Sequence, residues 1–284
     1  MACRICSDTR CPQHYRRAGH KLKCEKRVQF DPRSHASVAP VIAIDRRVCY
    51  LGSMSSPHTP PSAPSAACLQ PSTAIDSDHP LVLAFAREHA TGQTERERAV
   101  SLYLAVRDRL RYDPYRIDLS PAGMRASTAL SQGFGWCVPK AVALAAVARA
   151  AGIPARLGFA DVRNHLSTER LRQTMKTDVF AWHGYTALWI DGAWRKATPA
   201  FNLSLCEKFG LLPLEFDGVG DSLYHPYDRA GQRHMEYVNE RGQFDDLPLA
   251  AIRATFAELY PFWTQAPDVG TADFAQDAAR ESGA

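Results

Sequence analysis

The longest apolar run in the chain follows a glycine-rich loop and extends from Val138 to Ile153. It predicts a helix that stops at Gly152, with Pro154 placed where a helix cannot continue. Four residues interrupt the run, namely Pro139, Lys140, Arg149 and Gly152. It is therefore no membrane span, which needs about eighteen uninterrupted apolar residues. With 45% hydrophobic and 23% charged residues, the 284-residue chain is typical of a soluble globular protein with one good core.

The first 53 residues differ in composition from the remainder. They carry 11 Lys and Arg against 4 Asp and Glu, net +7, whereas residues 54–284 have a net charge of −3. They also hold five of the eight cysteines. Cys3 and Cys6 have the C-x-x-C spacing of zinc ligands, but no second pair follows and no apolar period frames a metal site. We expect residues 1–74 to be a leader, disordered or with translation starting at Met54, rather than a zinc or nucleic-acid module.

Two helices are predicted ahead of the apolar run. Asp78 suits an N-cap with Pro80 in the first turn, and this helix is predicted to run to Gly92. Thr94 and Glu97 have the T-x-x-E spacing of a capping box, which predicts a second helix ending near residue 112. A turn-rich loop and one more helical turn at residues 126–132 complete this half.

Strand patterns follow the apolar run. Residues 155–162 and 182–190 have strand character, Asp191-Gly192 is a two-residue hairpin signal, and residues 193–201 return as the partner strand. Helices followed by an antiparallel sheet favour an α+β fold. We expect a core domain at residues 75–202 and an extension at residues 203–284. The extension is predicted to contain a strand near residue 236, a helix at residues 249–260 and a disordered tail.

Cys137 lies where the glycine-rich loop becomes the apolar helix. Unpaired backbone N–H groups and the helix dipole stabilise a thiolate at that position, which makes the sulfur a better nucleophile. Gly133 and Gly135 allow a close approach of the backbone to a bound group. A small buried apolar residue is the alternative role for such a cysteine.

The predicted hairpin supplies His183 as a candidate general base for Cys137. With Asp191 and Gly192 as the loop, Ile190 pairs with Ala193, and further steps pair Tyr185 with Thr198 and His183 with Ala200. Alternation then puts His183, Tyr185 and Thr198 on one face. His183 and Thr198 become diagonal neighbours about 7 Å apart at Cα. A helix-start thiol, a strand imidazole and a nearby hydroxyl form a nucleophile, base and orienter set.

The segments GWCVPKAVALAAVARAAGIPARLGF and WHGYTALWIDGAWRKATP resemble the transglutaminase-like superfamily. That family carries G-x-C at a helix start, a GIPAR strand entry, a strand histidine and then W-x-x-x-D on the next strand. The likeness covers residues 80–202. It implies a papain-like α+β fold, with the nucleophile helix packed on an antiparallel β-sheet, Cys137 as nucleophile and His183 as general base.

This chain departs from the family pattern at Thr198, where the family has aspartate. A threonine oxygen can accept the imidazole N–H but carries no charge to stabilise an imidazolium. Asn202 is an alternative orienter. Asp161, Asn164 and His165 form a second polar cluster, in which His165 is an alternative base.

The resemblance implies cysteine-dependent acyl transfer on a peptide or side-chain amide through a thioester, with hydrolysis favoured over cross-linking. The alternative is a catalytically inactive binding module of the same fold. Trp136 and Tyr185 are candidates for the wall of a substrate groove. We expect no metal, no cofactor and neither a nucleic-acid nor a membrane partner. A working thiol and the lack of a secretory signal predict a cytoplasmic location.

Overall fold

A computed structural model describes residues 62–164, 167–223, 235–261 and 272–282. The chain divides into two units, Met1–Ser56 and Pro57–Ala284, and all the described residues belong to the second. Residues 1–61 of the expected leader, with the proposed start at Met54, therefore lie outside the described residues. Residues 62–74, which the sequence analysis assigned to the leader, are among the described residues, and Cys68 is fully buried there.

Helices come first along the chain, as predicted. They are the short 3-10 helix η1 (Ala66–Cys68), α1 (Pro80–His89), α2 (Glu95–Arg109) and α3 (Ala126–Gln132). The capping box of α2 is confirmed: Thr94 Oγ1 accepts the Glu97 N–H, and Glu97 Oε2 accepts the Thr94 N–H. The predicted cap of α1 is off by one residue, because His79 Nδ1 accepts the Leu81 N–H in place of Asp78.

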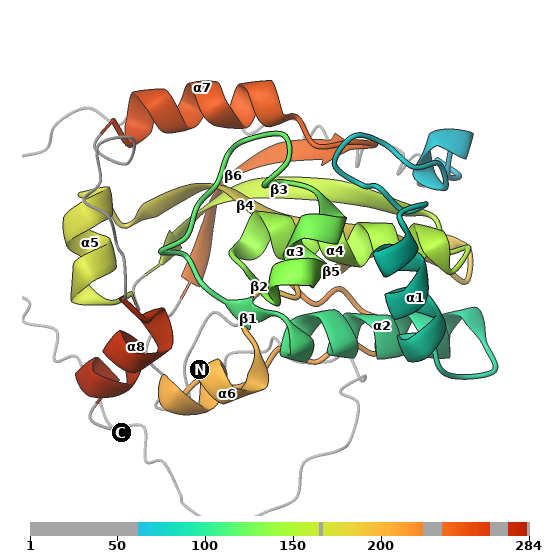
Figure 1. The fold of residues 1–284 in the computed structure, drawn as a ribbon, viewed down its shortest axis with the longest axis horizontal. Helices are drawn as coiled ribbons and strands as arrows, with labels where there is room; N and C mark the ends of the chain where they lie inside the picture. The colour runs from blue at the N-terminus through green and yellow to red at the C-terminus, as the bar shows by residue number, and fades with distance from the viewer. Residues whose placement is uncertain (1–61, 165–166, 224–234, 262–271, 283–284) are drawn as a thin grey trace, which may run out of the picture. The chain divides into compact units, whose positions relative to one another are not determined.

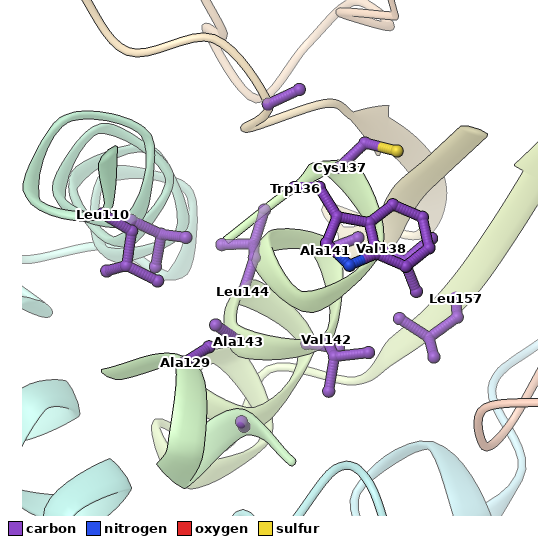
Figure 2. Packing of buried hydrophobic residues seen from close by; sticks show 14 of the residues in the cluster. Leu110, Ala129, Trp136, Cys137, Val138, Ala141, Val142, Ala143, Leu144 and Leu157 are labelled. Atoms are coloured by element: carbon purple, nitrogen blue, oxygen red, sulfur yellow. The ribbon is translucent and has the colours of Figure 1, made fainter. Parts of the chain in front are cut away.

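The apolar run forms α4 (Cys137–Ala150), and every residue from Cys137 to Arg149 is buried. Helices α1, α2 and α3 pack around it, and the sheet covers its remaining side (Figure 1). Figure 2 shows Val142 directed toward Leu157 on the sheet, whereas Leu144 is directed toward Leu110 at the end of α2. A helix that is apolar on all sides needs this complete enclosure.

The main sheet is antiparallel and has the strand order β5-β4-β3-β6. Its strands are β3 (Ala155–Asn164), β4 (Val179–Ile190), β5 (Ala193–Ala197) and β6 (Met235–Phe244). A separate parallel pair joins β1 (Arg111–Tyr112) to β2 (Phe134–Gly135), immediately before α4. The predicted α+β fold, with the Cys137 helix packed on an antiparallel sheet, is confirmed.

The hairpin register is confirmed near the turn and is wrong farther out. Ile190 pairs with Ala193 as predicted, but the ladder stops where Thr186 pairs with Ala197. At Thr198, just after β5, the chain no longer pairs with β4, and the Thr198 N–H donates to Ser222 O at 2.8 Å. Pro199 follows and has no N–H to offer a ladder, which explains why the predicted pairs at Thr198 and Ala200 do not form.

Four further helices follow β3 along the chain. They are α5 (Glu169–Met175), α6 (Leu203–Lys208), α7 (Leu249–Leu259) and α8 (Phe274–Ser282). Helix α7 matches the predicted terminal helix. The expectation of a disordered tail is wrong for residues 274–282, because α8 buries Phe274 and Ala278 against the domain. In the part of the chain that the structure describes, no helix has both the length and the apolarity to cross a membrane.

Candidate active site

Cys137 is the first residue of α4, and the parallel pair β1–β2 positions it. Trp136 is the N-cap residue, in an extended conformation that joins β2 to the helix. The β1 strand is itself held by Asn202, whose Oδ1 accepts the Tyr112 N–H at 2.9 Å. The thiol is buried, with 7% of the residue exposed.

Burial dominates the electrostatics of this thiol. Desolvation raises the pKa of Cys137 to about 12, although the backbone N–H groups of Gly184, Val138 and Cys137 itself act in the opposite direction. The backbone donors expected at the helix start are therefore present, but the expected lowering of the thiol pKa is wrong. The helix N-terminus does supply donors, but the resting sulfur is a neutral thiol because removal from water outweighs them.

Gly184 brings the start of α4 against β4. A Cβ at this position would lie 3.2 Å from Val138 Cα and 3.5 Å from Ala141 Cβ. Only glycine allows the sulfur of Cys137 to reach the Gly184 N–H at this spacing without displacement of the helix. A glycine inside a strand pattern signals such a close approach, and sequence reasoning missed it.

His183 directly precedes Gly184 and lies in a different environment. His183 is 5% exposed. Together with Thr198 it lines a hollow of about 360 Å³, a volume that includes space open to solvent. The structure thus brings His183 and Thr198 to the lining of one cavity. Cys137 is not among the residues that line it.

Thr198 reaches this cavity although its predicted strand pairing is absent. Its backbone is held between two elements, since its N–H donates to Ser222 O and its carbonyl accepts the Tyr103 hydroxyl at 3.2 Å. The side-chain Oγ1 is buried and has no hydrogen-bond partner among the described residues. An unpaired buried hydroxyl is costly, so this oxygen is available to a neighbouring donor or to a ligand.

The two predicted substrate contacts differ in position. Trp136 lines a second, apolar cavity with residues of α5, α7 and the start of β4. Tyr185 is fully buried, lines neither cavity, and donates its hydroxyl to Glu240 Oε1 at 2.9 Å. Its ring occupies the space over Gly158, where a Cβ would lie 2.1 Å from the Tyr185 Cζ. The geometry gives Tyr185 a packing role.

The alternative polar residues have structural partners. Asn202 bridges Tyr112 N–H and Ser204 Oγ through its amide. Asp161 accepts from the Trp182 N–H at 3.1 Å and from Arg241 Nε at 2.5 Å, which fixes the bulge at the start of β4. His165 lies outside the described residues. Across the described ranges, no group of three His, Cys, Asp or Glu side chains is placed to hold a metal ion.

Lys140 is a buried group that sequence reasoning did not assign. It lies one helical turn after Cys137, is fully buried, and its Nζ donates to Arg107 O and Leu110 O at 2.8 and 2.5 Å. Desolvation lowers the pKa of Lys140 to about 7. The side chain satisfies carbonyls at the C-terminal end of α2 and so ties that helix to the start of α4.

Residues 83–199 match the family model described as the transglutaminase-like superfamily. The resemblance noted in the sequence is thereby confirmed, and the match contains Cys137, His183 and Thr198. Among curated proteins, none matches the chain significantly.

Three solved structures are also similar to this chain. One is provisionally described as a cysteine protease from Cytophaga hutchinsonii, with 15% identity and a TM-score of 0.37 over 62% of this chain. The second, from Parabacteroides distasonis, is provisionally described as a protease, with 18% identity and a TM-score of 0.31 over 46% of this chain. The third is red sea bream transglutaminase, with 16% identity and a TM-score of 0.29 over 66% of this chain. The matches span 53%, 26% and 37% of those chains, respectively.

Proposed function

Since residues 83–199 match the model of the transglutaminase-like superfamily, we propose that the protein is a cysteine-dependent acyl-transfer enzyme that acts on a peptide or side-chain amide. Cys137 is the nucleophile, His183 is the general base and acid, and Thr198 orients the imidazole. Hydrolysis is the favoured outcome, with cross-linking to a second amine as the other fate of the same intermediate.

One observation carries this proposal. The start of α4 packs against β4 at Gly184, where an added Cβ would lie 3.2 Å from Val138 Cα. The Gly184 N–H lowers the pKa of the Cys137 thiol, and Gly184 directly follows His183. The thiol therefore lies against the strand backbone one residue from the imidazole, although the two groups come from elements far apart in the chain. A cysteine with a purely structural role would need no histidine beside it, whereas a nucleophile needs a base.

The neutral resting thiol defines the order of the steps. His183 takes the Cys137 proton as the sulfur attacks the carbonyl carbon, and a C–S bond forms. His183 then gives this proton to the leaving amine as the C–N bond breaks, which leaves a thioester. Water attacks the thioester, its proton passes through His183 to the sulfur, and the carboxylic acid departs. The Thr198 hydroxyl accepts the second imidazole N–H and selects the productive tautomer.

The rival function is a binding module of the same fold without catalysis. Two observations favour it: the raised pKa of the Cys137 thiol, and the uncharged Thr198 at the position of the family's aspartate. An imidazolium without a carboxylate partner is less stable, so the rival predicts no covalent intermediate at all.

Acylation by p-nitrophenyl acetate separates the two functions. We expect intact-mass and peptide analysis of the full chain to find an acetyl group on Cys137, followed by its release. His183→Ala should slow both steps by on the order of a hundredfold, the usual contribution of a general base. Cys68→Ala is the matched control, because this buried thiol contacts Asp245 and not the site. Equal acetylation of wild type and Cys137→Ala would contradict the proposal.

A second assay decides between hydrolysis and cross-linking. Dimethylcasein and dansylcadaverine are incubated with the wild type and with Cys137→Ala. New peptide termini or deamidated side chains indicate hydrolysis, whereas dansyl incorporation indicates transamidation. A nucleophilic thiol needs reducing conditions, which supports the cytoplasm as its compartment within this proposal.

A further inference from the structure

Trp182, the residue before His183, has a backbone conformation that tryptophan rarely adopts. Its φ is 60°, in the left-handed region, although it lies inside β4. The other non-glycine residues with a positive φ, among those that the structure describes, are Lys176 and Asp191. They lie at the end of α5 and in the hairpin turn, where this conformation is usual. In Trp182 the surrounding contacts must impose it, because a bulky side chain disfavours it.

Asp161, on the neighbouring strand β3, supplies the contact to the backbone. The register of β3 with β4 shifts between Ala160 and Val162, so Asp161 faces two residues of β4, as in a β-bulge. The extra residue of a bulge leaves the ladder, and its N–H needs another acceptor. Asp161 Oδ1 accepts the Trp182 N–H at 3.1 Å, and Asp161 is 8% exposed. The carboxylate thus replaces a missing ladder bond.

Arg241, on the other neighbour of β3, completes the support. It is the extra residue of a bulge in β6. Its Nε donates to Asp161 Oδ1 at 2.5 Å, and its guanidinium carbon lies 4.7 Å from the centroid of the Trp182 ring. The indole Nε1 of Trp182 donates to Thr255 Oγ1 of α7 at 3.0 Å. Three elements therefore hold the backbone and the ring of one strained residue.

The bulge determines how the chain arrives at the proposed base. His183 pairs with Ala160 as the first residue after the bulge, and Gly184 then meets the start of α4. Bulges change the direction of neighbouring side chains, so relaxation of Trp182 to an extended conformation would turn His183 away from its present orientation. We infer that Asp161 is a positioning residue, which orients the His183 imidazole by holding the Trp182 N–H. This inference rests on the proposed function.

Two substitutions in the full chain separate this role from the charge of the carboxylate. Asp161→Asn keeps an oxygen that accepts the Trp182 N–H, whereas Asp161→Ala removes it. We expect acetylation of Cys137 by p-nitrophenyl acetate to stay close to the wild-type rate in Asp161→Asn. In Asp161→Ala it should slow by at least about tenfold, because small displacements of a reacting group have effects of this size. Intact-mass measurement follows the rate.

Asp76→Ala is the matched control. Asp76 is 9% exposed, and its Oδ1 accepts the Ser127 N–H at the start of α3, also at 3.1 Å. Its loss removes a buried bond of the same kind outside the sheet. Urea unfolding should therefore show a comparable loss of stability, while the folded variant keeps the wild-type rate of acetylation.

The imidazole itself gives a readout that needs no activity. The ¹⁵N chemical shifts of His183, assigned by comparison with His183→Ala, report its tautomer and its surroundings. We expect these signals to be unchanged in Asp161→Asn and Asp76→Ala and to move in Asp161→Ala. If Asp161→Ala does not fold, Arg241→Met replaces it, because this change removes the guanidinium from both Asp161 and the Trp182 ring. Acetylation should then be at least about threefold slower than in the wild type.

The outcomes are distinguishable. If the wild type forms no acetyl-enzyme on Cys137, the proposed function fails, while the His183 signals still show whether Asp161 orients the imidazole. If the acetyl-enzyme forms, three results would overturn only this inference. They are a wild-type rate in the folded Asp161→Ala, or in Arg241→Met where it replaces that variant, an equal loss in Asp76→Ala, and His183 signals that do not move.

Discussion

Cys137 combines two opposing influences at one atom. Burial raises its pKa to about 12, against the backbone N–H groups that lower it. We therefore predict that the iodoacetamide alkylation rate of Cys137 in the full chain is low at pH 7 and still rising at pH 10. Peptide mass spectrometry measures this rate, and urea-unfolded protein is the control, in which the thiol titrates near its usual value of about 8.5. A plateau near neutral pH would contradict a neutral resting thiol.

Lys140 carries the opposite pH signature. Its pKa is about 7 in the fold, whereas an unfolded lysine titrates near 10.4. Between these values the unfolded chain binds more protons, so this group makes the free energy of unfolding rise with pH and contributes no further change below about pH 7.

The variant Lys140→Met tests this signature. It leaves Arg107 O and Leu110 O without the Lys140 donor, so it should destabilise the fold by on the order of 2 kcal/mol at pH 9. The difference from wild type should shrink as the pH falls toward 7. Urea unfolding at several pH values measures it, and other titrating groups cancel in the difference. Parallel pH profiles for the two proteins would show that Lys140 is not the titrating group.

At the scale of elements, the contact between α4 and β4 depends on Gly184. A Cβ there would press on Val138 Cα at 3.2 Å. We predict that Gly184→Ala costs about 1–3 kcal/mol of stability. It should also reduce acetylation of Cys137 several-fold, since the added Cβ displaces the start of α4 by a few tenths of an ångström and moves the nucleophile out of position.

Gly220→Ala is the matched control for this contact. Its added Cβ would find its nearest atom, Asp217 Oδ1, at 3.9 Å, so both stability and acetylation should stay near wild type. An equal loss of acetylation in the two variants would mean that the spacing of α4 and β4 does not control the thiol.

The register of β5 also belongs to this scale. The Asp191-Gly192 turn aligns the first pairs, because a two-residue loop allows one register. The end of the strand is decided elsewhere, since the Thr198 N–H pairs with Ser222 O. No pattern within residues 182–201 identifies that partner, which comes from a segment more than twenty residues later.

At the scale of the whole molecule, α8 returns the C-terminal part of the chain to the core. Phe274 packs against the rings of Tyr112 and Tyr115, at centroid distances of 5.7 and 5.3 Å. Asp277 Oδ2 accepts from the Tyr115 hydroxyl and from Arg170 Nε, each at 2.9 Å. The helix therefore connects α5 and the loop that follows β1.

Loss of the Phe274 ring should undock this helix. Phe→Ala changes in cores cost about 3–5 kcal/mol, which exceeds what the remaining contacts of one short helix supply. We predict that in Phe274→Ala the amides of residues 274–282 exchange at least about tenfold faster, while those of β3 and β4 do not change. Hydrogen-exchange mass spectrometry measures both regions. The exposed Gln276→Ala is the control, and unchanged protection of α8 in Phe274→Ala would refute the role of the ring.

Much of the fold follows from local sequence signals. The capping box of Thr94 and Glu97, the stop of α4 at Gly152 and the turn at Asp191-Gly192 involve groups within a few residues of one another, so their geometry is set by short-range hydrogen bonds and sterics. The enclosure of α4 was also determined by sequence, because a helix that is apolar all round must be buried. The candidates Cys137, His183 and Thr198 were readable from the same segments.

Tertiary structure alone decided the properties that depend on distant groups. The raised pKa of the Cys137 thiol, the approach of α4 at Gly184 and the cavity lined by His183 and Thr198 each arise from segments brought together only by folding. The docking of α8 is of the same kind, since Phe274 finds its partners more than 150 residues earlier in the chain. Burial and desolvation are properties of the packed molecule, and no local pattern encodes which surfaces will meet.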